Sequence, residues 1–328
     1  MPYLPNAPGL ATAADASVLI PTRNAGPGFR ETLEAIQQQR TARNFELVVV
    51  DSCSSDGTAE AAAAAGARVQ VIPQADFGHG RTRNLLASLA RGSQFVFMTQ
   101  DALPADELWL ERLMAGLDDP SVAACFGRQV ARPGASLLQQ HHLAWWYPQH
   151  ATRWSLRDPI EPRIGHLFYS HVNAACRSEV WDRFRFDESL VMSEDQEWSR
   201  RVLQAGWEVT YVPDAAVIHS HPYGLASVFR RHFDSGASLV GVTADSEADW
   251  LDRGLRYLGS ELRFLWRKRA LAEIPYAICF EATRYLGFSL GRRHRRLPKW
   301  IKVRLGEHSA AWAGAGSHHA GRAATTNW

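Results

Sequence analysis

Residues 48–58, VVVDSCSSDGT, join a buried strand to a polar loop. The apolar run Leu47 to Val50 predicts a strand that is buried on both faces, and Asp51 stands at its carboxyl end. The pair Asp56–Gly57 is typical of a turn, and Thr58 can begin a helix, so the loop needs no ligand to explain it. Asp51 is either a turn residue or a residue that faces a ligand.

The same order of strand, loop and helix occurs on both sides of this stretch. Apolar strand patterns precede and follow it and lead through a polar or glycine-rich loop to residues with helical spacing, at 17–36 and 67–92, and a further strand pattern follows at 94–101. Strands that alternate with helices predict βαβ crossovers. The sequence therefore predicts an α/β fold with a doubly wound, mostly parallel sheet flanked by helices, and a nucleotide-binding half over residues 17–120.

The rest of the chain follows other patterns. The alternation loosens over 121–225, which we interpret as an acceptor half, so that 17–225 would form one catalytic domain. Residues 226–310 form a helical, basic extension of the fold. We expect residues 1–16 to be a flexible leader and residues 311–328, which are small and polar, to be a disordered tail.

Composition narrows the class of protein. The chain has 328 residues, a net charge of +2 and no run of about 18 uncharged apolar residues, which excludes a transmembrane helix. Four cysteines lie far apart without metal-ligand spacing, which fits a reducing compartment. The leader lacks the features of a secretory signal. These features predict a cytoplasmic protein.

Several polar residues follow predicted strands, where open α/β sheets bind ligands. Thr22 and Arg23 follow the first strand, and Asp101, a candidate metal ligand, follows the fourth, just before Pro104, which we expect to begin a helix. Between Asp51 and Asp101 lies FGHGRTRN, residues 77–84, whose glycines and cations at a helix start favour an anion such as a diphosphate. A solvated basic turn is the alternative.

Two further clusters have both a structural and a functional interpretation. Glu194 and Asp195 are either ordinary acids in the first turn of a helix or a general base for a sugar hydroxyl. His219 and His221, two positions apart in an extended segment, face the same side and can ligate a metal. A pair of histidines without that role is the alternative.

Two other segments suggest surfaces. The insert with Trp145, Trp146 and Tyr147 suits a sugar acceptor groove or a packed core. Residues 284–304 contain eight Lys or Arg and no acid. Motifs for nucleic acid are missing, and an anionic membrane surface fits this segment better, with a solvated tail or a dimer contact as alternatives.

Taken in order, five blocks resemble family-2 inverting glycosyltransferases of the GT-A fold: VLIPTRNAG, VVVDSCSSDGT, FGHGRTRN, MTQDALP and SEDQEWSRRVLQAGW, over about residues 17–225. Within that family, TQDA, SEDQ and HSHPY look most like the bacterial rhamnosyltransferases that build O-antigen and related polysaccharides. That resemblance implies a dTDP-rhamnose donor and a lipid-linked glycan or polysaccharide acceptor at the inner face of the membrane.

The resemblance also implies residue roles. Asp195 matches the catalytic base, with Glu194 beside it, and a divalent cation, Mg²⁺ or Mn²⁺, would bind Asp101 with His219 or His221. Asp101 matches the last acid of the DXD signature, whose first acid is replaced here by Thr99. Donor contacts are implied for the residues of the matching blocks: Pro21, Thr22, Arg23, Asp51, His79, Arg83, Asn84, Gln100 and Asp101. Alternatives are a UDP-hexose donor or a catalytically silent sugar-nucleotide or glycan-binding protein of the same fold.

Overall fold

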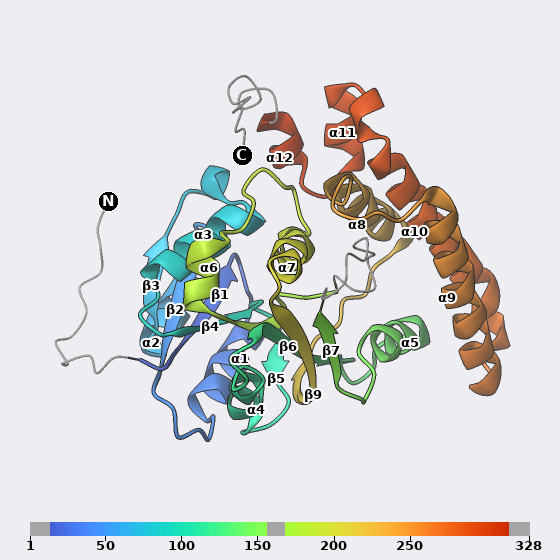
Figure 1. Ribbon diagram of the computed structural model, residues 1–328. Coiled ribbons are helices and arrows are strands. Elements are labelled where there is room, and N and C mark those ends of the chain that lie inside the picture. The colour runs from blue at the N-terminus through green and yellow to red at the C-terminus, as the bar shows by residue number, and fades with distance from the viewer. Residues whose placement is uncertain (1–13, 156–167, 315–328) are drawn as a thin grey trace.

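The computed structural model describes residues 14–155 and 168–314. In these residues one mixed sheet of nine strands has the order β3-β2-β1-β4-β8-β6-β9-β5, with β7 paired to β9 (Figure 1). The strands are β1 (Ala16–Thr22), β2 (Phe45–Asp51), β3 (Arg68–Val71), β4 (Gln94–Met98), β5 (Leu103–Pro104), β6 (Val122–Val130), β7 (Thr152–Ser155), β8 (Asn173–Arg177) and β9 (Glu208–Ile218).

Helices cover both faces of the sheet and continue beyond it. Those of the sheet region are α1 (Gly28–Gln37), α2 (Thr58–Ala64), α3 (His79–Leu89), α4 (Trp109–Ala115), α5 (Leu137–Trp146), α6 (Ser178–Arg183) and α7 (Glu194–Gln204). The later helices are α8 (Leu225–Ser238), α9 (Glu247–Arg267), α10 (Ile274–Arg292), α11 (Lys299–Leu305) and α12 (Ser309–Gly314). No described helix is long and apolar enough to span a membrane.

The first four long strands confirm the predicted crossovers. β1 to β4 run parallel, and the register places Thr22 of β1 opposite Asp51 of β2. Val48 to Val50 are at most 1% exposed because helices cover both faces. Alternate strand residues enter different cores, with Leu19 on one face and Ile20 on the other.

The second half of the sheet is mixed. β8 is antiparallel to β4 and β6, while β9 is parallel to β6. The expectation that Pro104 begins a helix is wrong, because Leu103–Pro104 forms the short edge strand β5, antiparallel to β9, and α4 begins at Trp109. Proline is tolerated at an edge because it has no N–H to leave unpaired.

The C-terminal helices follow the predicted helical extension. Helices α8 and α10 pack in close contact, since a Cβ at Gly287 or Gly291 would clash with the carbonyl oxygens of Phe229 and Phe233. Helices α9 and α10 lie along the right edge of the molecule in Figure 1. The domain limits at residues 16, 225 and 310 remain a proposal. Residues 1–13 of the expected leader and 315–328 of the expected tail lie outside the described residues.

Candidate active site

The ends of β1 and β2 are joined through Asp51. Its carboxylate is 1% exposed and accepts hydrogen bonds from the Thr22 hydroxyl at 2.8 Å and from the hydroxyl and backbone N–H of Ser54 at 2.6 and 2.8 Å. Asp51 aligns the strand ends through these hydrogen bonds. The turn predicted at Asp56–Gly57 is present, because the N–H of Thr58 donates to the Asp56 carboxylate at 3.2 Å and Gly57 has a φ of 84°.

The loop after β1 is fastened to its neighbours by backbone contacts. Asn24 has a left-handed backbone with φ of 41°, and its N–H donates to the Ser54 hydroxyl at 2.8 Å. The Gln100 amide accepts from the N–H of Arg23 at 2.7 Å and donates to its carbonyl at 3.2 Å. Gln100 thus holds the loop after β1 against the loop that carries Asp101.

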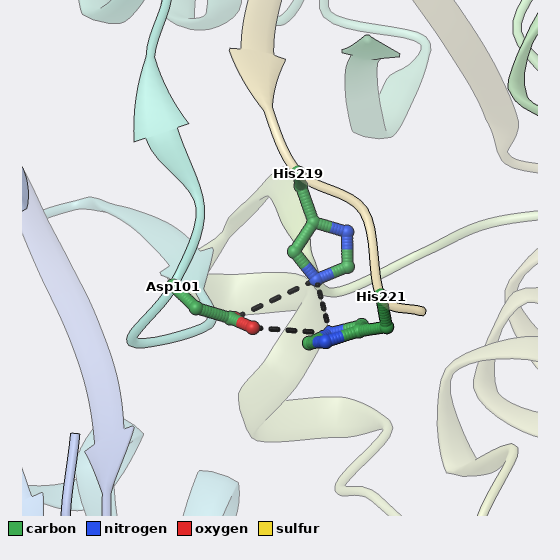
Figure 2. A group of neighbouring side chains, drawn as sticks. All are labelled: Asp101, His219 and His221. Carbon is green, nitrogen blue, oxygen red and sulfur yellow. Dashed lines mark hydrogen bonds and ion pairs between the residues drawn. The ribbon is translucent and has the colours of Figure 1, made fainter. Parts of the chain in front are cut away.

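Asp101, His219 and His221 form a compact cluster with ligand atoms within 4.8 Å of one another. Figure 2 shows both imidazole rings directed at the Asp101 carboxylate, with the acid on the segment between β4 and β5 and the histidines just after β9. The His221 Nε2 lies 3.0 Å from one carboxylate oxygen, and the His219 Nε2 lies 3.5 Å from the other. One carboxylate and two imidazoles can ligate a divalent cation.

A second layer of contacts orients His219. Its Nδ1 lies 2.9 Å from the amide oxygen of Gln129, which can only accept, so Nδ1 carries the proton and Nε2 keeps its lone pair. The nitrogen of the same amide donates to the Ser170 hydroxyl at 3.2 Å and to the Tyr147 hydroxyl. No pattern in the sequence marks Gln129, since a glutamine within a strand has no motif around it.

The acid pair lies at the start of α7, after Ser193, whose φ of 62° is unusual for a residue with a side chain. The Glu194 carboxylate pairs with the Arg83 guanidinium at 2.9 Å, with side-chain exposures of 4% and 7%. The second acid, Asp195, is partly exposed and accepts from the backbone N–H of His171 at 3.4 Å. Because Glu194 is paired with Arg83, Asp195 is the acid of the two that remains a candidate for proton transfer.

The surroundings separate the two acids electrostatically. Burial and the charge of Glu194 raise the pKa of Asp195 to about 7, although Arg83 opposes them. Burial also acts on Glu194, but the Arg83 charge and a hydrogen bond with His171 outweigh it and hold its pKa below the usual range. Burial lowers the pKa of His171 to about 4, so this residue is neutral at pH 7. A carboxyl group with a pKa near 7 suits a general base.

The pKa of Asp101 is shifted in the direction opposite to that of Asp195. Burial alone would raise the pKa of Asp101, but its contacts with His219 and His221 hold that pKa well below its usual range. Asp101 is therefore ionised at every physiological pH.

Residues of the 77–84 block take different places. His79 faces Arg83, with its Nδ1 3.4 Å from the guanidinium, and burial lowers the pKa of His79 to about 3. The Asn84 amide is used within the protein, because it donates to the Phe186 carbonyl and to Glu188 and accepts from the Trp181 indole. Asn84 therefore fastens α3 to the segment before α7.

The three aromatic residues expected to line an acceptor groove differ in their surroundings. Trp145 is 40% exposed and lies against the ring of Tyr257, whereas Trp146 stacks on Phe168. Tyr147 is 6% exposed, and its hydroxyl contacts Gln129, the partner of His219. Of the three, only Trp145 has the exposure that a stacked sugar would need.

An acid and two histidines follow the carboxyl ends of β4 and β9, and an acid pair begins α7, which is an arrangement that fits a glycosyltransferase of the GT-A class. The chain belongs to glycosyl transferase family 2, whose profile matches residues 17–184. It is 32% identical to the O-antigen chain rhamnosyltransferase WbaN of Salmonella anatum over 86% of this chain and 90% of that protein. The corresponding RfbN of Salmonella typhimurium is 33% identical over 86% of this chain and 91% of its own length.

Solved structures share the fold. The mannosyltransferase PcManGT from Pyrobaculum calidifontis, in complex with GDP-Man and Mn²⁺, aligns with a TM-score of 0.59 at 19% identity, over 87% of this chain and 88% of that one. TarS 1–349 of S. aureus in complex with UDP-GlcNAc aligns with a TM-score of 0.54 at 18% identity, over 86% and 91%. The predicted family and GT-A fold are confirmed.

Proposed function

We propose that this glycosyltransferase moves L-rhamnose from dTDP-rhamnose onto a hydroxyl group of a lipid-linked glycan or polysaccharide, with inversion at the anomeric carbon. Similarity over most of both chains to two O-antigen chain rhamnosyltransferases supports this sugar and this class of acceptor.

One observation carries the catalytic part of the proposal, namely that Glu194 is paired with Arg83 at 2.9 Å while Asp195, the next residue at the start of α7, is partly exposed. Asp195, with a pKa of about 7, takes the proton of the acceptor hydroxyl. The hydroxyl oxygen forms a bond to the anomeric carbon while the bond from that carbon to the diphosphate oxygen breaks. Glu194 and Arg83 hold the start of α7 in place, so they position Asp195 and do not take the proton themselves.

Asp101, His219 and His221 would hold the divalent cation, Mg²⁺ or Mn²⁺. The cation, when bound, supplies positive charge to the diphosphate that leaves. The ionised carboxylate and the lone pair that Gln129 secures on His219 fit this role. The two imidazoles compensate for Thr99, which replaces the first acid of the signature.

We place the nucleoside beside Pro21, Thr22 and Arg23, at the strand end that Asp51 aligns, and the diphosphate toward His79. Gln100 and Asn84 then contribute by holding loops and not by touching the donor. Their hydrogen bonds within the protein support this division.

We also propose that the protein binds the anionic inner face of the cell membrane from the cytoplasm, through part of residues 284–304. Trp300 is 68% exposed, and the exposed cations Arg295, Arg296, Lys299 and Arg304 lie near it in the chain, while Arg293 is paired with Glu247 at 2.7 Å. Arg284 does not belong to this surface, because it pairs with Glu281 at 2.8 Å and lies over the ring of Tyr257. Each exposed cation adds about 1 kcal/mol of attraction to such a surface.

The test combines donor, acceptor and one substitution. Purified protein, dTDP-rhamnose, Mn²⁺ and lipid-linked acceptor should yield rhamnosylated product, and Asp195→Asn should lower kcat by about 10² to 10⁴-fold while nucleotide affinity stays within a few-fold. Asp182→Asn, an exposed acid on α6, is the matched control and should leave the rate unchanged.

Other outcomes would replace the proposal. Transfer from a UDP-hexose but not from dTDP-rhamnose would replace the donor. Donor binding without transfer to any acceptor would favour the silent binding protein. An unchanged rate in Asp195→Asn would remove Asp195 from its role.

A further inference from the structure

The segment between α11 and α12 reaches into the active site from the far end of the chain. It is anchored by Asp234 of α8, which is fully buried and accepts from the backbone N–H of His308 at 2.9 Å and from the Trp312 indole at 2.7 Å. Gly306 lies so close to Asp234 and Trp312 that any side chain there would clash with them. The position of Glu307 and His308 is therefore set by packing.

Arg231 lies one turn before Asp234 on α8 and stands between this segment and the cluster of Asp101, His219 and His221. Its guanidinium lies over the ring of Tyr223, 5.5 Å from the ring centre, and that ring is 5.5 Å from the ring of His221. On its other side, Arg231 is 3.5 Å from the carboxylate of Glu307. Arg231 thus joins the metal cluster to the C-terminal segment.

His308 continues the same line of contacts to the acid pair. Its Nε2 lies 3.2 Å from the Nε2 of His79, and the other side of the His79 ring faces Arg83. Contacts therefore run without a break from Asp101, through Arg231 and the C-terminal segment, to Arg83 and Glu194. This line of contacts joins the cluster of Asp101, His219 and His221 to the acid pair at the start of α7.

Among the cations of this line, Arg231 is the one that a ligand can reach. Arg83 is 7% exposed and neutralised by Glu194, whereas Arg231 is 41% exposed and its carboxylate partner Glu307 is 32% exposed. A partly exposed pair of this kind is weak, so a ligand with more negative charge than one carboxylate can replace Glu307. A guanidinium binds two phosphate oxygens at once.

We propose that Arg231 binds the terminal phosphate of the nucleoside diphosphate, and that Glu307 occupies Arg231 in the free protein. This inference rests on the proposed function, which places the nucleoside at the ends of β1 and β2. On one side, Asp101 is connected to that edge, because the neighbouring Gln100 bonds to Arg23. On the other side, Asp101 contacts His221, whose ring packs on Tyr223, and Arg231 lies over the Tyr223 ring. The terminal phosphate is therefore the one nearer to Arg231. His308 positions His79 beside it.

Calorimetric titration with dTDP and with dTMP, in the presence of Mn²⁺, tests the assignment on the full chain. Arg231→Gln should weaken dTDP binding about tenfold and leave dTMP within twofold, because only the diphosphate has a terminal phosphate to lose. Glu307→Gln should strengthen dTDP binding a few-fold by freeing Arg231. Arg230→Gln, an exposed neighbour on α8, should change neither affinity.

Arg231→Gln and Glu307→Gln together distinguish phosphate binding by Arg231 from a merely structural contact of Arg231 with the C-terminal segment. If Arg231 only held the C-terminal segment in place, both Arg231→Gln and Glu307→Gln would weaken dTDP binding, and that result would overturn the proposal. An unchanged ratio of dTDP to dTMP affinity in Arg231→Gln would overturn it as well. The same titrations with UDP and UMP keep the test independent of the donor, since binding of UDP alone would contradict dTDP-rhamnose but still report on Arg231. A protein that binds neither nucleoside diphosphate would refute both proposals.

Discussion

Removal of the Arg83 guanidinium should destabilise the protein severely, because it leaves Glu194 charged and buried. The two groups are 2.9 Å apart and at most 7% exposed. At an effective dielectric constant of about 20, unit charges at this distance attract by roughly 6 kcal/mol. Desolvation offsets part of that attraction, and removal of one partner of a buried pair costs about 3–5 kcal/mol. We expect Arg83→Met to lower the free energy of unfolding by that amount.

Urea unfolding, followed by tryptophan fluorescence, measures this loss. The double variant Arg83→Met/Glu194→Met should recover at least about 2 kcal/mol of it, since no unpaired charge remains. The matched control is Arg40→Met, which breaks an exposed pair with Glu107 at 2.6 Å and should cost at most about 1 kcal/mol. A loss below about 1 kcal/mol for Arg83→Met, or a double variant no more stable than the single one, would refute the reasoning.

Three other predictions concern the reaction and the surface. The rate should rise with pH through an apparent pKa of about 7, because Asp195 accepts a proton only when ionised; a rate that stays flat from pH 5.5 to 8.5 would contradict this. Gln129→Leu should weaken activation by Mn²⁺ about tenfold or more, because His219 loses the partner that orients it. Metal titration of the rate measures this change, and equal Mn²⁺ requirements in the two proteins would remove Gln129 from this role. The triple variant Arg295→Glu, Arg296→Glu and Lys299→Glu reverses three exposed charges. It should bind anionic vesicles at least about 100-fold more weakly and neutral vesicles equally well. Persistent binding to anionic vesicles would place the membrane contact elsewhere.

Much of the fold was predictable because its signals are local. The apolar run before Asp51 and the helical spacing after each loop predicted the parallel strands correctly, since each pattern depends only on neighbours in the chain. Pro104 shows where local signals fail. A proline after an acid suits a helix start, but pairing with β9, more than 100 positions away, makes it an edge strand.

The candidate site was predictable to the extent that strand ends carry its residues. Asp101, His219 and His221 each follow a strand, and the structure brings them together. Gln129, Arg231 and His171 had no such signal. Their roles depend on which side chains lie opposite them, and nothing in their own sequence neighbourhood contains that information.

The sequence by itself determined the family, the parallel strands of the first half and the acids at their ends, because periodicity and motif spacing record the environment of each residue along one short segment. Only the tertiary structure decided what those residues contact. Arg83 meets Glu194 across 111 positions, and His79 meets His308 across 229. Such contacts arise from how helices and strands pack, and they decide which of the two acids at the start of α7 is paired with a guanidinium.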